Sequence, residues 1–269
     1  MHATHILPKG RAYLSGLKRL MATQRNRPHV SLRQPKGTAF ELDWWHQALS
    51  RSSPIRPIPA PTQVFDVDAF SDASSGTGIA FLVGQKWKAW RLRPEWQTDG
   101  HDIAWAKSVT FELMARAVVE EHGQHKSYKL YCDNRTVVEG WHNGRSRNRH
   151  VNLTFRHLHD LADQHDCKLL SRYIPSALNP ADGPSRGHYL VYPPSFHSTH
   201  PDPSISNFFI DALLPQSQQE TRAARAGSDF APLQAERPSA PAHRRAQDLS
   251  EQERRGTTHL EQSISCSNS

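Results

Sequence analysis

Residues 64–79 read VFDVDAFSDASSGTGI, and this stretch decides how the folded part of the chain begins. Val64 to Ser71 is predicted to be a strand that runs into an aspartate, Asp72. The small residues SSG that follow predict a turn, and Thr77–Val83 predicts a second strand. The stretch therefore predicts a hairpin with an acid at the end of its first strand.

Strands give way to an alternation of helices and strands after this hairpin. A third strand is predicted over 86–92 and a long helix over 103–122. Two more strands (128–132 and 168–174), two helices between them (136–141 and 151–165) and a short helix after Pro180 complete the pattern. With the two middle helices counted as one connection, the order is βββαβαβα. This order predicts an α/β fold, a five-stranded mixed sheet with helices on its faces.

Composition divides the chain into three predicted segments. Residues 1–58 are strongly basic and contain two amphipathic patterns, one after Pro8 and one over 39–50 with Leu42, Trp45 and Leu49 on one face. These helices either pack on a neighbour or contact nucleic acid. Residues 59–188, which begin in a proline-rich connector, are predicted to be globular. Residues 189–269 are predicted to be a mostly disordered tail whose apolar island, 208–210, is a candidate docking point.

Bulk properties limit the class of protein. The chain has 269 residues, 36% of them hydrophobic, and a net charge of +7, which suits a partner made of phosphates. Cys132, Cys167 and Cys266 have no paired spacing, so neither a disulfide framework nor a zinc ribbon is expected. No apolar run approaches the roughly 20 residues that cross a bilayer. We therefore expect no membrane partner and an intracellular protein, cytoplasmic or nuclear.

Four acids lie where they could support chemistry: Asp72, Glu112, Asp133 and Asp182. If the first and fourth strands are parallel neighbours, Asp72 and Asp133 end at the same rim of the sheet. Carboxylates gathered in this way suit two Mg²⁺ or Mn²⁺ ions and hydrolysis of a phosphodiester. Each acid taken alone is also explained as a turn residue or a helix cap.

The local sequences around these acids resemble the four motifs of the type 1 ribonuclease H family. The stretches are SDASSGTGIA at 71–80, FELMA at 111–115, YCDNRTVV at 131–138 and YIPSALNPADGPSR at 173–186, the last in the form used by retroelement polyproteins. LPKGRAYL at 7–14 and LDWW at 42–45 resemble the connection between polymerase and ribonuclease H in fungal-type retroelements, including the tyrosine-recombinase group. No Tyr-x-Asp-Asp motif of a polymerase palm occurs.

The resemblance implies a ribonuclease H-like fold and a function. The chain is expected to hydrolyse the RNA strand of RNA–DNA hybrids with two ions held by the four acids, beside a reverse-transcriptase polymerase domain or subunit. An inactive nucleic-acid-binding module, or a connection module, of a retroelement polyprotein is the alternative. Residues expected to contact the hybrid are Asn134, Arg145, Arg147, Arg149, Asn179 and Arg186.

Two positions depart from the family pattern. Lys107 stands in AWAK, residues 104–107, where related elements often carry an acid. This leaves Glu112 as the helix carboxylate that the resemblance selects. Residues 173–182 also contain no histidine, although the family has a mobile one shortly before its last aspartate.

Overall fold

The computed structural model describes residue 4 and residues 7–27, 29, 31, 33–35, 37–51, 63–191 and 194–212. Its central feature is a six-stranded mixed sheet in the order β5-β4-β1-β2-β3-β6. The predicted α/β class is confirmed, whereas the predicted number of five strands is wrong by one. The strands are β1 Val64–Ala73, β2 Gly78–Val83, β3 Lys86–Leu92, β4 Ser127–Cys132, β5 Lys168–Tyr173 and β6 Phe209–Asp211.

The sheet is antiparallel on one side of β1 and parallel on the other. β1 pairs antiparallel with β2, with Asp72 opposite Ala80. It pairs parallel with β4, with Ser71 opposite Cys132. Because parallel neighbours end at the same edge, Asp72 in β1 and Asp133 just after β4 lie at one rim of the sheet.

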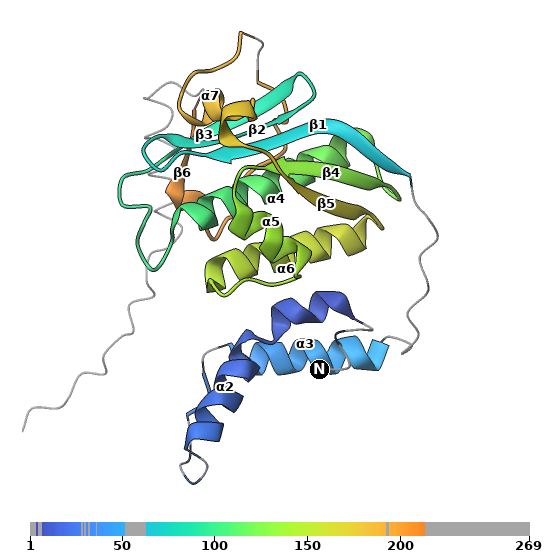
Figure 1. Ribbon diagram of the computed structural model, residues 1–269, viewed down its shortest axis with the longest axis vertical. Coiled ribbons are helices and arrows are strands. Elements are labelled where there is room, and N and C mark those ends of the chain that lie inside the picture. Colours follow the sequence, from blue (N-terminus) through green and yellow to red (C-terminus); the bar gives the residue numbers. More distant parts are fainter. Residues whose placement is uncertain are drawn as a thin grey trace, which may run out of the picture. The chain divides into compact units, whose positions relative to one another are not determined.

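Helices cover both faces of this sheet (Figure 1). The main core forms under α4, where Phe111, Met114 and Val118 are fully buried with Phe155 of α6. The short helix α7 covers the opposite face, where Ala181 packs with Leu82 and Trp87. The helices of this region are α4 Ile103–His122, α5 Arg135–His142, α6 Arg149–Gln164 and α7 Asp182–Ser185, with a 3-10 turn, η2, at Ser176–Leu178.

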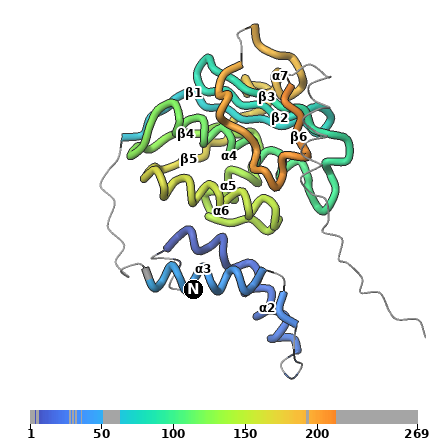
Figure 2. The backbone as a smooth tube through the Cα atoms, turned by 180° about the vertical axis from the view of Figure 1, so that it is seen from behind, coloured from blue at the N-terminus to red at the C-terminus, as the bar shows by residue number. Residues whose placement is uncertain are grey.

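The sixth strand comes from the segment predicted to be a disordered tail. β6 pairs antiparallel with β3 and follows a 3-10 turn, η3, at Ser206–Phe208 (Figure 2). Phe196 and Phe209 are buried in the main core. The buried ammonium of Lys88 donates hydrogen bonds to the carbonyls of Phe196 (2.9 Å) and Thr199 (2.7 Å). The apolar island is thus part of the sheet, and residues 213–269 of the predicted tail lie outside the described residues.

The basic first segment forms a 3-10 helix, η1 Pro8–Tyr13, and two α-helices, α2 Ser15–Asn26 and α3 Thr38–Arg51. The indole of Trp45 donates a hydrogen bond to the Tyr13 carbonyl at 3.0 Å. The predicted apolar face of the second helix is only partly used, because Leu42 and Leu49 are 50% and 58% exposed. No helix among the described residues is long and apolar enough to cross a membrane. The boundaries of the three predicted segments stay a prediction.

Candidate functional site

Three of the four predicted acids share contacts at the rim where β1 and β4 end, through Lys107, Ser176 and Ser185. We call Asp72, Asp133 and Asp182 the carboxylate cluster. Asp182 reaches the rim because α7 is fixed to β1. The Ser185 hydroxyl donates a hydrogen bond to Asp72, and the Asn179 amide donates to the Ser71 carbonyl at 3.0 Å.

Lys107 of α4 lies between two members of the carboxylate cluster. Its Nζ is 2.9 Å from Asp72 Oδ1 and 2.6 Å from Asp133 Oδ1. The side chains of Asp72 and Asp133 are only 2% and 4% exposed, and that of Lys107 is 13% exposed. A charge pair shielded from water to this degree is held far more firmly than a surface ion pair.

The ionisation of the cluster follows from this contact. Burial favours the neutral amine of Lys107, but hydrogen bonds to Asp133 and Asp72 and their charges outweigh it and raise its pKa. Burial raises the pKa of Asp133 as well, and the charge of Asp72 adds to this. Lys107 carries its ammonium charge, because two carboxylates face it at hydrogen-bonding distance.

Asp182 has a cationic partner of its own. Arg186 Nε lies 2.9 Å from Asp182 Oδ2, and the Ser176 hydroxyl is 3.3 Å from Asp182 Oδ1. The hydrogen bond from Arg186 lowers the pKa of Asp182. Three carboxylates therefore face two cations, Lys107 and Arg186, and one negative charge remains in excess.

Glu112 does not join the carboxylate cluster, so its placement there from the sequence is corrected. Its Oε1 accepts hydrogen bonds from Arg116 at 2.6 and 3.0 Å, and its Oε2 lies 3.2 Å from His157 Nδ1 of α6. Five residues along an α-helix turn the side chain by about 140° and advance it by about 7.5 Å. Glu112 therefore faces α6, and Lys107 is the α4 side chain that faces the rim.

Two asparagines predicted to contact the hybrid have structural roles. The side-chain oxygen of Asn134 caps α5 by accepting from the Val137 N–H at 3.1 Å. Asn179 is 5% exposed, and its oxygen accepts from the Ala181 N–H while its amide holds the Ser71 carbonyl. Asn179 therefore positions α7, and its side chain is occupied within the protein.

The predicted arginines separate into two locations. Arg145, Arg147 and Arg149 are exposed in and beside the loop that leads into α6, and Arg149 Nε donates to His150 Nε2 at 3.0 Å. Arg186 is at the carboxylate cluster and is 55% exposed.

The two ions that the resemblance implies do not fit the residues at the rim. The ammonium of Lys107 already pairs with Asp72 and Asp133, two of the carboxylates that would hold the ions. The helix carboxylate is turned toward α6, and the excess charge is a single negative one against the four positive charges of two divalent ions. Within the described ranges, no group of three or more His, Cys, Asp or Glu side chains is arranged to hold a metal ion.

Comparison with known proteins finds no matching family and no matching curated protein. Two solved structures are similar. One is ribonuclease H1 from the halophilic archaeon Halobacterium salinarum, with 13% identity, a TM-score of 0.34 and coverage of 44% of this chain and 91% of that one. The other is an N-terminal ribonuclease H domain from Mycobacterium tuberculosis, solved as a fusion with maltose-binding protein, with 12% identity, a TM-score of 0.31 and coverage of 44% and 92%. Both likenesses are distant, so the role of the site has to follow from this chain's own residues.

The sequence reasoning missed two features of the site. Ser176 and Ser185 contact the carboxylate cluster. Their positions in the sequence follow no pattern that marks them as site residues. The sequence marks Lys107 only as a departure from the family pattern. The start of the helix nevertheless shows at which end of α4 its side chain lies. Asp102 caps α4 through the Trp105 N–H at 2.8 Å, which places Lys107 near the N-terminal end of the helix.

Proposed function

We propose that this chain is a ribonuclease H-like module of a retroelement reverse transcriptase that binds RNA–DNA hybrid and does not cut it. The observation that carries the proposal is the position of the Lys107 ammonium, 2.9 Å from Asp72 and 2.6 Å from Asp133. A cation supplied by the protein thus already pairs with two of the carboxylates that would hold an ion. The retroelement origin is supported by the motif resemblance alone.

Charge favours binding of a polyanion without cleavage. Carboxylates without cations would repel the phosphates of a nucleic acid. Lys107 and Arg186 offset most of this repulsion at the rim. The net charge of +7 and the exposed Arg145, Arg147 and Arg149 supply attraction that does not depend on base sequence. Among nucleic acids we favour the hybrid because of the family resemblance, and 2′-hydroxyl contacts would distinguish its RNA strand.

Cleavage is the second candidate, because Asp72, Asp133 and Asp182 do converge at one rim. It requires that Lys107 leave its two partners when ions bind. The carboxylates released in this way would then hold Mg²⁺ or Mn²⁺, which supplies an activated water for hydrolysis of the phosphodiester. As they are arranged, the residues favour binding over this alternative.

A gel assay with labelled hybrid separates the candidates. The full chain should retain the hybrid at low salt and leave both strands intact in Mg²⁺, in Mn²⁺ and in EDTA. Cutting of the RNA strand that needs the metal, with 3′-hydroxyl and 5′-phosphate ends, would overturn the non-cutting proposal in favour of the nuclease. Neither retention nor cutting would overturn both and leave a connection module that positions a polymerase.

A further inference from the structure

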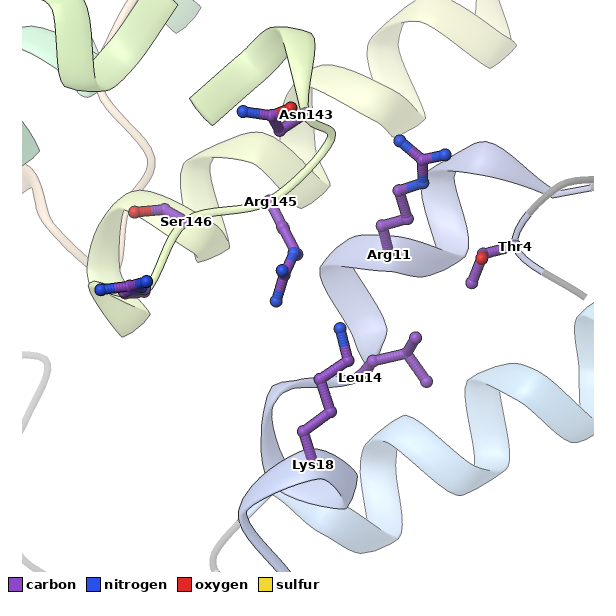
Figure 3. A pocket seen from close by; sticks show the side chains of 8 residues that line it. Thr4, Arg11, Leu14, Lys18, Asn143, Arg145 and Ser146 are labelled. Atoms are coloured by element: carbon purple, nitrogen blue, oxygen red, sulfur yellow. The ribbon is translucent and has the colours of Figure 1, made fainter. Parts of the chain in front are cut away.

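A basic pocket lies between the first segment and the loop after α5, away from the carboxylate cluster. Its cavity of about 530 Å³ is lined by Thr4, Arg11, Leu14, Lys18, Asn143, Arg145, Ser146 and Arg147. Figure 3 shows Arg145 and Lys18 pointing toward one another across it, one from the loop and one from α2. Two parts of the chain that are far apart in sequence therefore contribute cations to the same space.

Asn152 of α6 ties the two walls of this pocket together. Its side-chain oxygen accepts from the Ser146 N–H of the loop at 3.0 Å, and its amide donates to the Ala12 carbonyl of η1 at 2.7 Å. Asn152 is only 2% exposed. Gly144 of the loop lies beside Arg11, since a Cβ there would be 3.6 Å from the Arg11 side chain, an ordinary contact distance. The two walls of the pocket are thus joined through one buried side chain.

The charge of the pocket is not balanced from within. Arg11, Lys18, Arg145 and Arg147 give it four cations, and none of them has an ion-pair partner in the part of the chain that the structure describes. Burial, together with the charges of Arg145 and Arg11, lowers the pKa of Lys18. Like charges that face one another across a cavity favour the binding of an anion between them.

We infer that this pocket binds a phosphate group, and that residues of the first segment and of the loop after α5 bind it together. The inference deepens the proposed function and rests on it where the phosphate belongs to a nucleic-acid backbone. A tetrahedral oxyanion accepts several hydrogen bonds, which suits three guanidinium groups and an ammonium that approach from opposite walls. A phosphodiester of the hybrid and free phosphate share this chemistry, and experiment distinguishes them.

The backbone source is tested by the salt dependence of hybrid binding. The double variant R11A/K18A should bind hybrid more weakly and reduce the slope of log K against log salt by about two, because each alanine removes one cation that meets a phosphate. Arg19→Ala is the matched control, because Arg19 is an exposed cation of the same helix that does not line the pocket. A slope in R11A/K18A equal to that of the control would overturn the backbone role while leaving hybrid binding, and so the proposed function, intact.

Inorganic phosphate is the probe for the pocket by itself. At equal ionic strength, phosphate should raise the melting temperature of the wild-type chain more than chloride does, and in R11A/K18A this difference should fall to the general stabilisation that phosphate gives any folded protein. The pocket inference would then stand even if the chain bound no hybrid. Equal stabilisation of wild type and R11A/K18A by phosphate would overturn it.

Discussion

The carboxylate cluster and the basic pocket are both concentrations of charge, but only the cluster contains charges of both signs. At the cluster, Lys107 and Arg186 pair with three acids inside the protein. At the pocket, four cations face one another without a described acid. A buried charge that keeps its partner avoids the large cost of standing alone, whereas unpaired cations around a cavity favour an external anion. The comparison therefore separates a site whose charges are paired within the protein from a site whose charges are open to an anion.

Removal of the Lys107 cation should have the largest effect. Lys107→Met leaves Asp72 and Asp133 buried beside each other, so the free energy of unfolding should fall by about 3–5 kcal/mol. Urea denaturation followed by circular dichroism measures this loss. Lys86→Met is the control, because Lys86 pairs with Glu121 at the surface and should cost less than about 1 kcal/mol. Equal losses in the two variants would show that the cluster is not held by Lys107.

Reversal of the same charge should convert the carboxylate cluster into a metal site. Lys107→Glu places a fourth carboxylate at the rim, and Mn²⁺ at a hundredfold excess over its Kd should then stabilise the variant by about 2.7 kcal/mol. Denaturation with and without Mn²⁺, supported by the paramagnetic signal of the bound ion, checks this. Lys107→Gln, which adds no charge, should respond less. The same stabilisation of the wild-type chain would contradict the idea that Lys107 excludes the ion.

Breaking the link under the basic pocket should have a smaller effect. Asn152→Ala removes a buried side chain and leaves the part-buried Ser146 N–H without its acceptor, which should cost about 1–3 kcal/mol of unfolding free energy. The loosened pocket should also reduce the salt dependence of hybrid binding, although no cation has been removed. Gln164→Ala is the control, because Gln164 is an exposed residue at the end of the same helix, away from the pocket lining, and its change should stay within about 0.5 kcal/mol. An unchanged slope of log K against log salt in Asn152→Ala would show that the Asn152 hydrogen bonds are not needed for hybrid binding by the pocket.

The contact between Glu112 and His157 should give the smallest effect, a pH-dependent one. The hydrogen bond to Glu112 raises the pKa of His157 above its ordinary value of 6.5. The stabilisation is therefore fully present below pH 6.5 and is lost as pH rises through the raised pKa. The difference in unfolding free energy between wild type and His157→Gln, on the order of 1 kcal/mol, should shrink over that range.

Denaturation at several pH values measures this dependence. His125→Gln removes an ion pair with Asp166 that is open to solvent and should leave the pH dependence of stability as it is. A difference in unfolding free energy between wild type and His157→Gln that grows with pH would contradict the contact between Glu112 and His157.

Much of the fold could be predicted because the elements of the sheet carry strong local patterns. The helix at 103–122 and the strand at 86–92 begin and end where the sequence predicts. β6 was missed because three residues have no period of their own, and only their pairing with β3 makes them a strand. Pairing of this kind is a tertiary effect that local pattern does not contain.

The site was predicted less well than the fold, because the direction of a side chain around its helix decides which residues meet. Asp72 and Asp133 follow from the parallel pairing of two strands, which the sequence made plausible. The resemblance of residues 111–115 to the family's helix motif points to Glu112, whereas its angle around α4 turns it toward His157. The basic pocket depends on contacts across more than 100 residues, such as Asn152 with Ala12, which no spacing along the chain encodes.

The strand β6 decides which recombinant fragment of the sheet region should fold without its first segment. A recombinant fragment ending at residue 188, the predicted boundary, would remove Phe196 and Phe209 from the core and uncover the outer edge of β3. A bare strand edge beside exposed aromatic surface recruits other chains, so such a fragment should collect in inclusion bodies. A fragment that extends through residue 212 keeps its own edge strand and should remain in solution.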